Sequence, residues 1–405
     1  MKTRPTRATS LLVGVIAVCA ALTAACGGDD SPSGGSPGKG GGSTVIGADI
    51  ARTGYISAFD LPGYQTLASA AQDPSAEGPE LEVKIADNKS DATTAANVAT
   101  SLTDGGADLL MISCSYPIAA ASTAISQARN IVAFTPCTSD QRFGPKGLGS
   151  LVYGFGLSIQ SEAAAMAEFT ADQGWKRVYL LEDTALDYPG RVCSGFKHRF
   201  AELGGTVAGQ ETFKNDDQSI TSQASKIRAH KGDFDAVVLC SYPPGGGKAV
   251  LQLRQAGIST PIVSHYGMDG AFWAGGIPHL SDFYALSPAS AYGDDPVPAV
   301  NDLAAAYAKE TGQAPATGAF VYGADSASIL RAALAKAGGA KGDALNAALE
   351  GLGTVDVLSG KVTIDPTYHA IFDRQVRVIR ATDGKFGFFK LLSPKDPAAL
   401  VPYTN

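Results

Sequence analysis

The sequence lacks the residue patterns that hold metal ions or drive nucleophilic catalysis. Its 405 residues include 5 histidines and 6 cysteines, but no H-E-x-x-H motif, no C-x-x-C pair and no acidic calcium loop. The formal net charge is −7 and no basic cluster stands out, so no nucleic acid partner is expected. The longest apolar run, Leu11 to Ala25, has 15 residues, too few to span a bilayer. We expect no metal and no other cofactor.

The N-terminus has the order of a secretory signal. Basic residues precede the apolar segment 11–25, and the small residues before Cys26 resemble a bacterial lipobox. We expect residues 1–25 to be a lipoprotein signal peptide and Cys26 to be acylated; the alternative is an ordinary signal peptide that leaves Cys26 as a thiol. Residues 26–43 are rich in glycine and serine, which predicts a flexible tether. The chain is therefore expected to be extracytoplasmic and lipid-anchored to the bacterial cell membrane.

The rest of the sequence alternates between strand-like and helix-like segments. Expected strands cover 44–50, 81–87, 108–113 and 131–136 in a first series, and 177–183, 206–213, 236–240 and 261–267 in a second. Most of them lack the alternation of a half-exposed strand, which favours parallel sheets covered by helices on both faces. Two such series predict an α/β protein with two doubly wound parallel-sheet lobes.

Unusual polar and aromatic clusters follow five of the expected strands, at the edge where open α/β sheets bind ligands. The clusters are Ser113–Tyr116, Thr135–Ser139, Asp183–Tyr188, Cys240–Tyr242 and Tyr266–Asp269. A catalytic Cys114 would need a histidine base, and of the five histidines only His265 sits at a strand end. An exported hydrolase is therefore the less favoured interpretation, and we expect no catalytic residues.

Binding of a small ligand fits these clusters better than catalysis. A helix beginning at Pro117 offers unpaired N–H groups and a positive dipole end, which favour an anion. Ser115 adds a hydroxyl to this helix start, and the segment "CTSD" supplies two more on the neighbouring strand. Such a pocket would grip a carboxylate, while Asp269 on the opposite lobe could pair with an ammonium group.

Several segments, taken in order, resemble the type I periplasmic binding proteins. They are "TVIGADIARTGYISAF", "VKIADNKSDATTAANVATSLTDGGADLLMISCSYP", "VAFTPCTSD", "LLEDTALDYPG" and "IVSHYGMDG". The branched-chain amino acid and amide group (Leu/Ile/Val-binding-like) of ABC-transporter substrate-binding lipoproteins is the most similar. The resemblance implies a Venus-flytrap fold with a three-segment hinge, in which 44–156 and 286–370 form lobe 1, and 157–285 and 371–405 form lobe 2.

The resemblance also implies a ligand site. The turns after the third and fourth strands would hold a carboxylate through Ser115, Cys137, Thr138 and Ser139, and Phe59 would cover the ligand. Lobe 2 would add Tyr188, Tyr242 and Asp269, the last for an amine. Three further aromatics, Tyr116, Tyr266 and Trp273, could narrow or flatten the site, so an amide or an aromatic acid stays open beside an amino acid. The plainer alternatives are loop tyrosines at 188 and 242, a capping role for Asp269, and packing roles for Phe59 and Trp273.

Four cysteines remain in the folded part, an even number that indicates two disulfides in an exported protein. Cys114 and Cys137 end adjacent strands of one lobe, and Cys193 and Cys240 lie on the other, so these two pairings are favoured. The family role implies a monomer that is not an enzyme and that delivers its ligand to an ABC permease and its ATPase subunits. The alternative is a ligand-sensing lipoprotein that docks on a membrane receptor or kinase.

Overall fold

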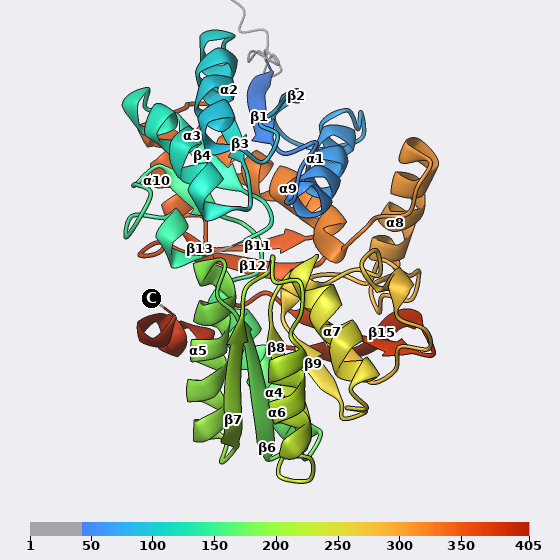
Figure 1. The fold of residues 1–405 in the computed structure, drawn as a ribbon. Coiled ribbons are helices and arrows are strands. Elements are labelled where there is room, and N and C mark those ends of the chain that lie inside the picture. Colours follow the sequence, from blue (N-terminus) through green and yellow to red (C-terminus); the bar gives the residue numbers. More distant parts are fainter. Residues whose placement is uncertain (1–42, 139, 405) are drawn as a thin grey trace, which may run out of the picture. The chain divides into compact units, whose positions relative to one another are not determined.

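The computed structural model describes residues 43–138 and 140–404 of the chain. The expected signal peptide, Cys26 and residues 27–42 of the tether lie outside this part, and so does Ser139. None of the described helices is long and apolar enough to cross a membrane. The described chain forms two lobes, each built around a sheet (Figure 1).

Lobe 1 is centred on a five-stranded parallel sheet with the order β2-β1-β3-β4-β5. Its strands are β1 (Thr44–Ile50), β2 (Leu81–Asp87), β3 (Leu109–Ile112), β4 (Val132–Thr135) and β5 (Val152–Gly154). The helices between them are α1 (Ser57–Ala71), α2 (Ala92–Asp104) and α3 (Tyr116–Ala128). A later segment adds α8 (Pro298–Thr311), α9 (Val321–Lys336), α10 (Asp343–Glu350) and a small antiparallel sheet of β11 (Thr354–Val357), β12 (Gly360–Asp365) and β13 (Ala370–Ile371).

Lobe 2 is centred on a seven-stranded sheet with the order β15-β14-β10-β9-β8-β6-β7. Its strands are β6 (Arg177–Asp183), β7 (Thr206–Phe213), β8 (Ala236–Cys240), β9 (Ile262–Ser264), β10 (Phe283–Ser287), β14 (Val376–Thr382) and β15 (Lys385–Leu392). The last two are antiparallel additions at one edge. The helices are α4 (Ile159–Asp172), α5 (Asp187–Glu202), α6 (Thr221–Ala229) and α7 (Gly245–Gln255).

Local sequence signals explain where several helices begin. The Asp91 carboxylate accepts a hydrogen bond from the backbone N–H of Thr94 (2.7 Å) at the start of α2, and α3 has a proline in its first turn. Every residue of β3 and β4 is buried, as expected for strands covered on both faces. The predicted α/β fold with two parallel-sheet lobes is confirmed. The expected strands did not include β5 or β10 to β15.

The chain passes between the lobes three times: from β5 to α4, from β10 to α8, and from β13 to β14. Arg374, in the third connection, is 1% exposed and joins two of these passages. Its Nη2 donates to the carbonyl oxygen of Phe155 in the first connection (2.8 Å), and its Nη1 lies 2.5 Å from the Asp325 carboxylate in α9. The first and third connections are therefore held together by a buried guanidinium.

A second buried arginine, at the start of β14, reaches the second connection. Arg377 in β14 makes two hydrogen bonds to Asp295, from Nε to Oδ2 (3.0 Å) and from Nη2 to Oδ1 (3.1 Å). Both side chains are 0% exposed, and Asp295 lies between β10 and α8. Two parallel bonds of this kind are strong and fix geometry as well as charge.

We expect Arg377→Leu to lower the free energy of unfolding by about 3–5 kcal/mol, because it leaves the Asp295 carboxylate buried without its cation. The measurement is urea denaturation followed by circular dichroism. Lys390→Leu is the control, since it breaks an exposed pair with Asp172 (2.8 Å; side chains 39% and 55% exposed), which is worth less than about 1 kcal/mol. Equal losses in the two variants would contradict the role given to the buried pair.

A buried carboxylate in lobe 1 makes stability depend on pH. Asp49 in β1 is 0% exposed and accepts hydrogen bonds from Ser122 Oγ (2.6 Å) and Asn88 Nδ2 (3.2 Å). Burial raises the pKa of its carboxyl from 3.8 to about 7, against the opposing effect of these two hydrogen bonds. The folded chain therefore holds this proton more tightly than the unfolded chain, and stability falls as pH rises between about 4 and 7.

We expect Asp49→Asn to remove this dependence. Across the interval from 3.8 to about 7, the wild type should lose about 4 kcal/mol relative to the variant, from 1.36 kcal/mol per pH unit. Urea denaturation at pH 4, 5.5 and 8 measures the difference. As a control, Asp356→Asn, at a carboxylate that is 81% exposed, should leave the dependence of unfolding free energy on pH unchanged. If the unfolding free energies of the wild type and of Asp49→Asn change in parallel with pH, the assignment is wrong.

Candidate functional site

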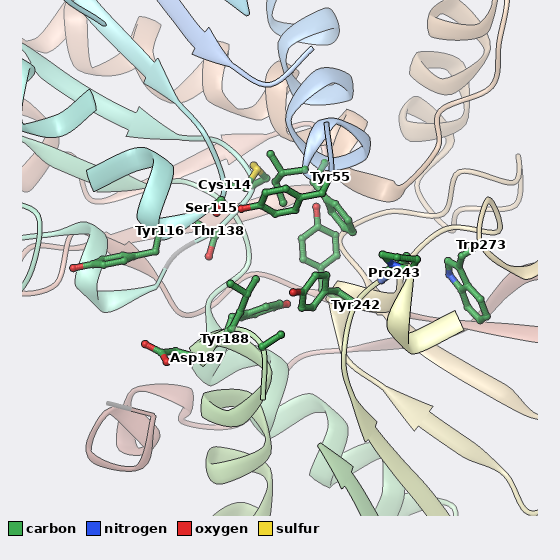
Figure 2. Close-up of a pocket in the computed structure, with 18 of the residues that line it drawn as sticks. Tyr55, Cys114, Ser115, Tyr116, Thr138, Asp187, Tyr188, Tyr242, Pro243 and Trp273 are labelled. Carbon is green, nitrogen blue, oxygen red and sulfur yellow. Dashed lines mark hydrogen bonds between the residues drawn. A yellow bond between two sulfur atoms is a disulfide. The ribbon is translucent and has the colours of Figure 1, made fainter. Parts of the chain in front are cut away.

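A cavity of about 750 Å³ lies where the turns at the carboxyl ends of both sheets meet. Its wall comes from the turns after β1, β3 and β4 in lobe 1, from those after β6, β8 and β9 in lobe 2, and from the start of α4. Figure 2 shows side chains of the two lobes converging on this space. The volume is typical of a small-molecule site, and its place is the one expected for ligands of open α/β sheets.

Most of the residues predicted for the site line this cavity. From lobe 1 these are Phe59, Ser115, Tyr116, Cys137 and Thr138. From lobe 2 they are Tyr188, Tyr242, Tyr266 and Trp273. Ser139 lies outside the described residues. The structure therefore brings nine residues from the ends of separate strands around one space.

Asp269 is the exception, and its expected role in the cavity needs correction. It is 2% exposed and does not line the cavity. Its carboxylate accepts hydrogen bonds from Gly270 N (2.7 Å), Ser287 Oγ (2.8 Å) and Gly318 N (2.7 Å). The 3₁₀ helix Tyr266–Met268 after β9 turns the chain, so this carboxylate faces β10 and the start of α9 instead of the ligand space. Burial raises its pKa to about 7.

A buried aspartate holds two of the lobe 1 turns in place. Asp60 in α1 is 1% exposed and accepts hydrogen bonds from Ala51 N and Cys114 N, both at 2.9 Å. Burial raises its pKa to about 6. The Cys114 turn leads into Ser115, whose hydroxyl lies 2.8 Å from the Tyr55 hydroxyl at the cavity wall (Figure 2). Ser115 also precedes the first turn of α3, so its hydroxyl and the positive end of the helix dipole face one corner of the cavity.

One disulfide is part of the cavity wall, and the other lies close behind a turn of that wall. Cys114 is joined to Cys137, with their Cα atoms 5.6 Å apart, and Cys193 to Cys240, with their Cα atoms 6.0 Å apart. These are the pairings that the strand order favoured. Asp60 stands beside the first of them, but two bonded sulfurs offer no thiolate to a metal ion or to a substrate.

Aromatic rings make up much of the cavity wall. Nine aromatic side chains line it, including Tyr55, Phe143 and Phe272 beside the predicted ones. Tyr55, Tyr188 and Tyr242 surround its centre, with Tyr116 and Trp273 towards opposite edges (Figure 2). The ring of Phe59 packs edge-on against that of Tyr266, with centroids 5.3 Å apart. Such a wall suits a ligand with an apolar or flat body and few polar groups.

Ion pairs between the lobes border the cavity. The carboxylate of Asp140, after β4, is bound by Arg142 of the same lobe (2.8 Å) and by Arg191 in α5 of lobe 2 (3.0 Å). Arg142 also lies 3.5 Å from Asp187 of α5. Asp140 is 4% exposed and Arg191 is 11% exposed, so the contact between Asp140 and Arg191 is shielded from water. Burial lowers the pKa of Arg191, and the nearby Asp140 opposes that change.

Several polar residues of the cavity wall were not assigned to the site from the sequence, among them Tyr55, Asp140, Arg142, Glu162 and Lys248. Tyr55 lies in the loop after β1, close in sequence to the predicted Phe59, and could have been found from that place. Asp140 ends the segment "CTSD" and could have been found from its place after a strand. Glu162 lies in an alanine-rich helix and carries no motif that would mark it.

Comparisons with known proteins agree with this fold. A sequence model of the periplasmic binding protein family matches residues 45–385. The leucine-binding protein from Thermotoga maritima is 23% identical, with a TM-score of 0.73 over 87% of this chain and 99% of that chain. The branched-chain amino acid transporter substrate-binding protein from Streptococcus pneumoniae, in complex with isoleucine, is 21% identical, with a TM-score of 0.72 over 87% and 100%.

A third solved structure widens the range of ligands among similar folds. The solute-binding protein of an ABC transporter from R. palustris, in complex with benzoate, is 18% identical, with a TM-score of 0.71 over 87% of this chain and 97% of that chain. A search of curated proteins found no match. The family match spans most of the sequence, and both lobes have counterparts in the solved structures. The chain belongs to the periplasmic binding protein family.

Proposed function

We propose that this protein is an extracytoplasmic solute-binding lipoprotein of an ABC importer, which captures a small carboxylate-bearing ligand between its lobes. The observation that carries the proposal is the cavity of about 750 Å³ walled by the strand-end turns of both lobes. The family match supports the binding role. Acylation at Cys26 would keep the protein beside the membrane, where it would act as a monomer and deliver its ligand to a permease driven by an ATPase.

The ligand's carboxylate would bind at the lobe 1 corner of the cavity. Ser115 and Tyr55 offer hydroxyl groups there, Thr138 adds a third, and the start of α3 adds the favourable end of a helix dipole. The aromatic wall would take the apolar body. Branched-chain and other amino acids and aromatic acids meet these requirements, and an amide would offer its carbonyl oxygen in place of the carboxylate. The proteins solved with isoleucine and with benzoate show that this fold holds both kinds of acid.

Closure of the two lobes about the hinge would enclose the ligand. The three connections between the lobes allow one lobe to rotate against the other, and ligand contacts with both lobes would favour the closed state. The ion pair between Asp140 and Arg191 joins the lobes at the cavity border. It would form on closure and hold the closed state together with the ligand.

A thermal-shift screen of the purified protein against amino acids, amides and aromatic acids tests the proposal. A true ligand at a thousandfold excess over its Kd should stabilise the folded state by about 4 kcal/mol. Ser115→Ala should weaken binding of the ligand found by up to about tenfold, the value of one hydrogen bond. Ser219→Ala, at a residue on the exposed surface of lobe 2, is the control. If no carboxylate-bearing compound shifts the melting temperature, the proposed function is wrong.

The lobe-bridging ion pair gives a separate prediction. Arg191→Gln should raise the Kd of the ligand roughly five- to tenfold, because Asp140 loses one of its two guanidinium partners and the closed state loses a charge-assisted contact. In small-angle X-ray scattering without ligand, the radius of gyration of the variant should be at least as large as that of the wild type. Arg177→Gln is the matched control, because Arg177 pairs with Asp235 within lobe 2 (3.0 Å). An unchanged Kd in Arg191→Gln would exclude a role for this pair in closure.

A further inference from the structure

Glu162 is a buried acidic side chain in the wall of the cavity. It lies in the first turn of α4, is 1% exposed, and lines the cavity together with Tyr188 and Tyr266. Its Oε2 atom accepts hydrogen bonds from the Tyr188 hydroxyl (2.7 Å) and from the backbone N–H of Tyr266 (3.2 Å). These two donors fix the position of the carboxylate, so Tyr188 is a positioning residue for Glu162.

This carboxylate has no cationic partner among the described residues. Its single basic neighbour there is His265, whose Nδ1 lies 3.5 Å from Oε2. The backbone N–H of Gly267 donates to the same Nδ1 at 3.0 Å, so that nitrogen acts as an acceptor and does not present a proton to Glu162. Within the described chain, the Oε1 atom receives no hydrogen bond, and it is not sealed away from the cavity. One oxygen of a buried carboxylate is thus left for a ligand.

A second unpartnered group lies in the same wall. The Tyr266 side chain is 5% exposed and lines the cavity, and its hydroxyl oxygen is buried with no hydrogen-bond partner among the described residues. Its ring is held edge-on by Phe59 on one side and by Tyr322 on the other, with centroid distances of 5.3 and 6.1 Å. A buried hydroxyl without a partner is costly unless something in the cavity completes it.

We propose that Glu162 and the Tyr266 hydroxyl receive a protonated amine of the ligand, and that Glu162 is the residue that selects ligands with such a group. The proposal rests on the proposed function, because it concerns the same cavity. A carboxylate held at the lobe 1 corner and an ammonium held at Glu162 define a zwitterion whose apolar body lies among the rings. Simple aromatic acids fill the same space but leave Glu162 without its cation, which is costly in a buried site.

Matched pairs of probes that differ only in the amine test this selection. The pairs are L-leucine with 4-methylpentanoate and L-phenylalanine with 3-phenylpropanoate, titrated calorimetrically into the purified full chain. We expect the amino member of at least one pair to bind at least tenfold more tightly, and Glu162→Gln to abolish that preference. Glutamine has the same shape and still accepts from Tyr188 and Tyr266, so the change removes charge and little else.

Glu168→Gln is the matched control on the same helix. Glu168 accepts a hydrogen bond from Lys395 N (3.1 Å) and does not line the cavity, so the preference for the amino member should survive in this variant. Tyr266→Phe is a second variant that keeps the fold even if Glu162→Gln does not. It should reduce the affinity for the amino member roughly threefold to tenfold and change that for the deaminated member less.

The outcomes separate the two proposals. Equal or tighter binding of the deaminated members, unaffected by Glu162→Gln, overturns the role of Glu162 and leaves the solute-binding function standing. A preference for the amino members that survives in both Glu162→Gln and Tyr266→Phe overturns it as well. If no member of either pair binds and the wider thermal-shift screen is also silent, the proposed function fails, and the inference that rests on it fails with it.

Discussion

The relation between the lobes depends on two buried arginines at the three connections. Arg374 binds the carbonyl oxygen of Phe155 and the Asp325 carboxylate, and Arg377 binds Asp295. A guanidinium group removed from water needs partners that offset its lost hydration. Arg374 therefore requires the first and third passages of the chain to lie together, and Arg377 requires the same of the second passage and the start of β14. The shape of the cavity depends on this arrangement, because α4, which carries Glu162, begins directly after the first passage. Misplacing one connection would shift a wall of the site.

Each lobe then supplies rigid support for its own turns. In lobe 1 the Asp60 carboxylate holds the turns after β1 and β3, and the Cys114–Cys137 bond joins the turns after β3 and β4. In lobe 2 the Cys193–Cys240 bond ties α5 to the end of β8. A ligand between the lobes therefore meets pre-arranged hydroxyls and rings, and little conformational freedom remains to be lost when it binds.

The strand ends could be predicted from the sequence because parallel sheets place their functional turns at one edge. Ser115, Thr138, Tyr188 and Tyr242 follow that rule, and all four line the cavity. Asp269 also follows a strand end, but it does not line the cavity. A 3₁₀ helix after β9 turns its side chain toward Ser287 and Gly318. A turn's final direction depends on such tertiary hydrogen bonds, which no local pattern encodes.

Other site residues could not be predicted from the sequence for the same reason. Glu162 sits in a helix whose sequence indicates only burial; its importance comes from the loops that bring Tyr188 and Tyr266 to its carboxylate. The sequence around Arg191 is typical of an exposed helix face. Only the fold brings Asp140 of the other lobe to its guanidinium group. The strands β5 and β11 to β13 are at most six residues long, too short for their patterns to stand out from loops.

The two disulfides have a consequence for when the protein can work. Cys114 and Cys137 are themselves in the cavity wall, and Cys240 lies two positions before Tyr242, which is also there. In a reducing compartment these four sulfurs would be thiols, and the turns that shape the cavity would lose their covalent ties. The cavity would therefore reach the shape described here only after all four cysteines have been oxidised.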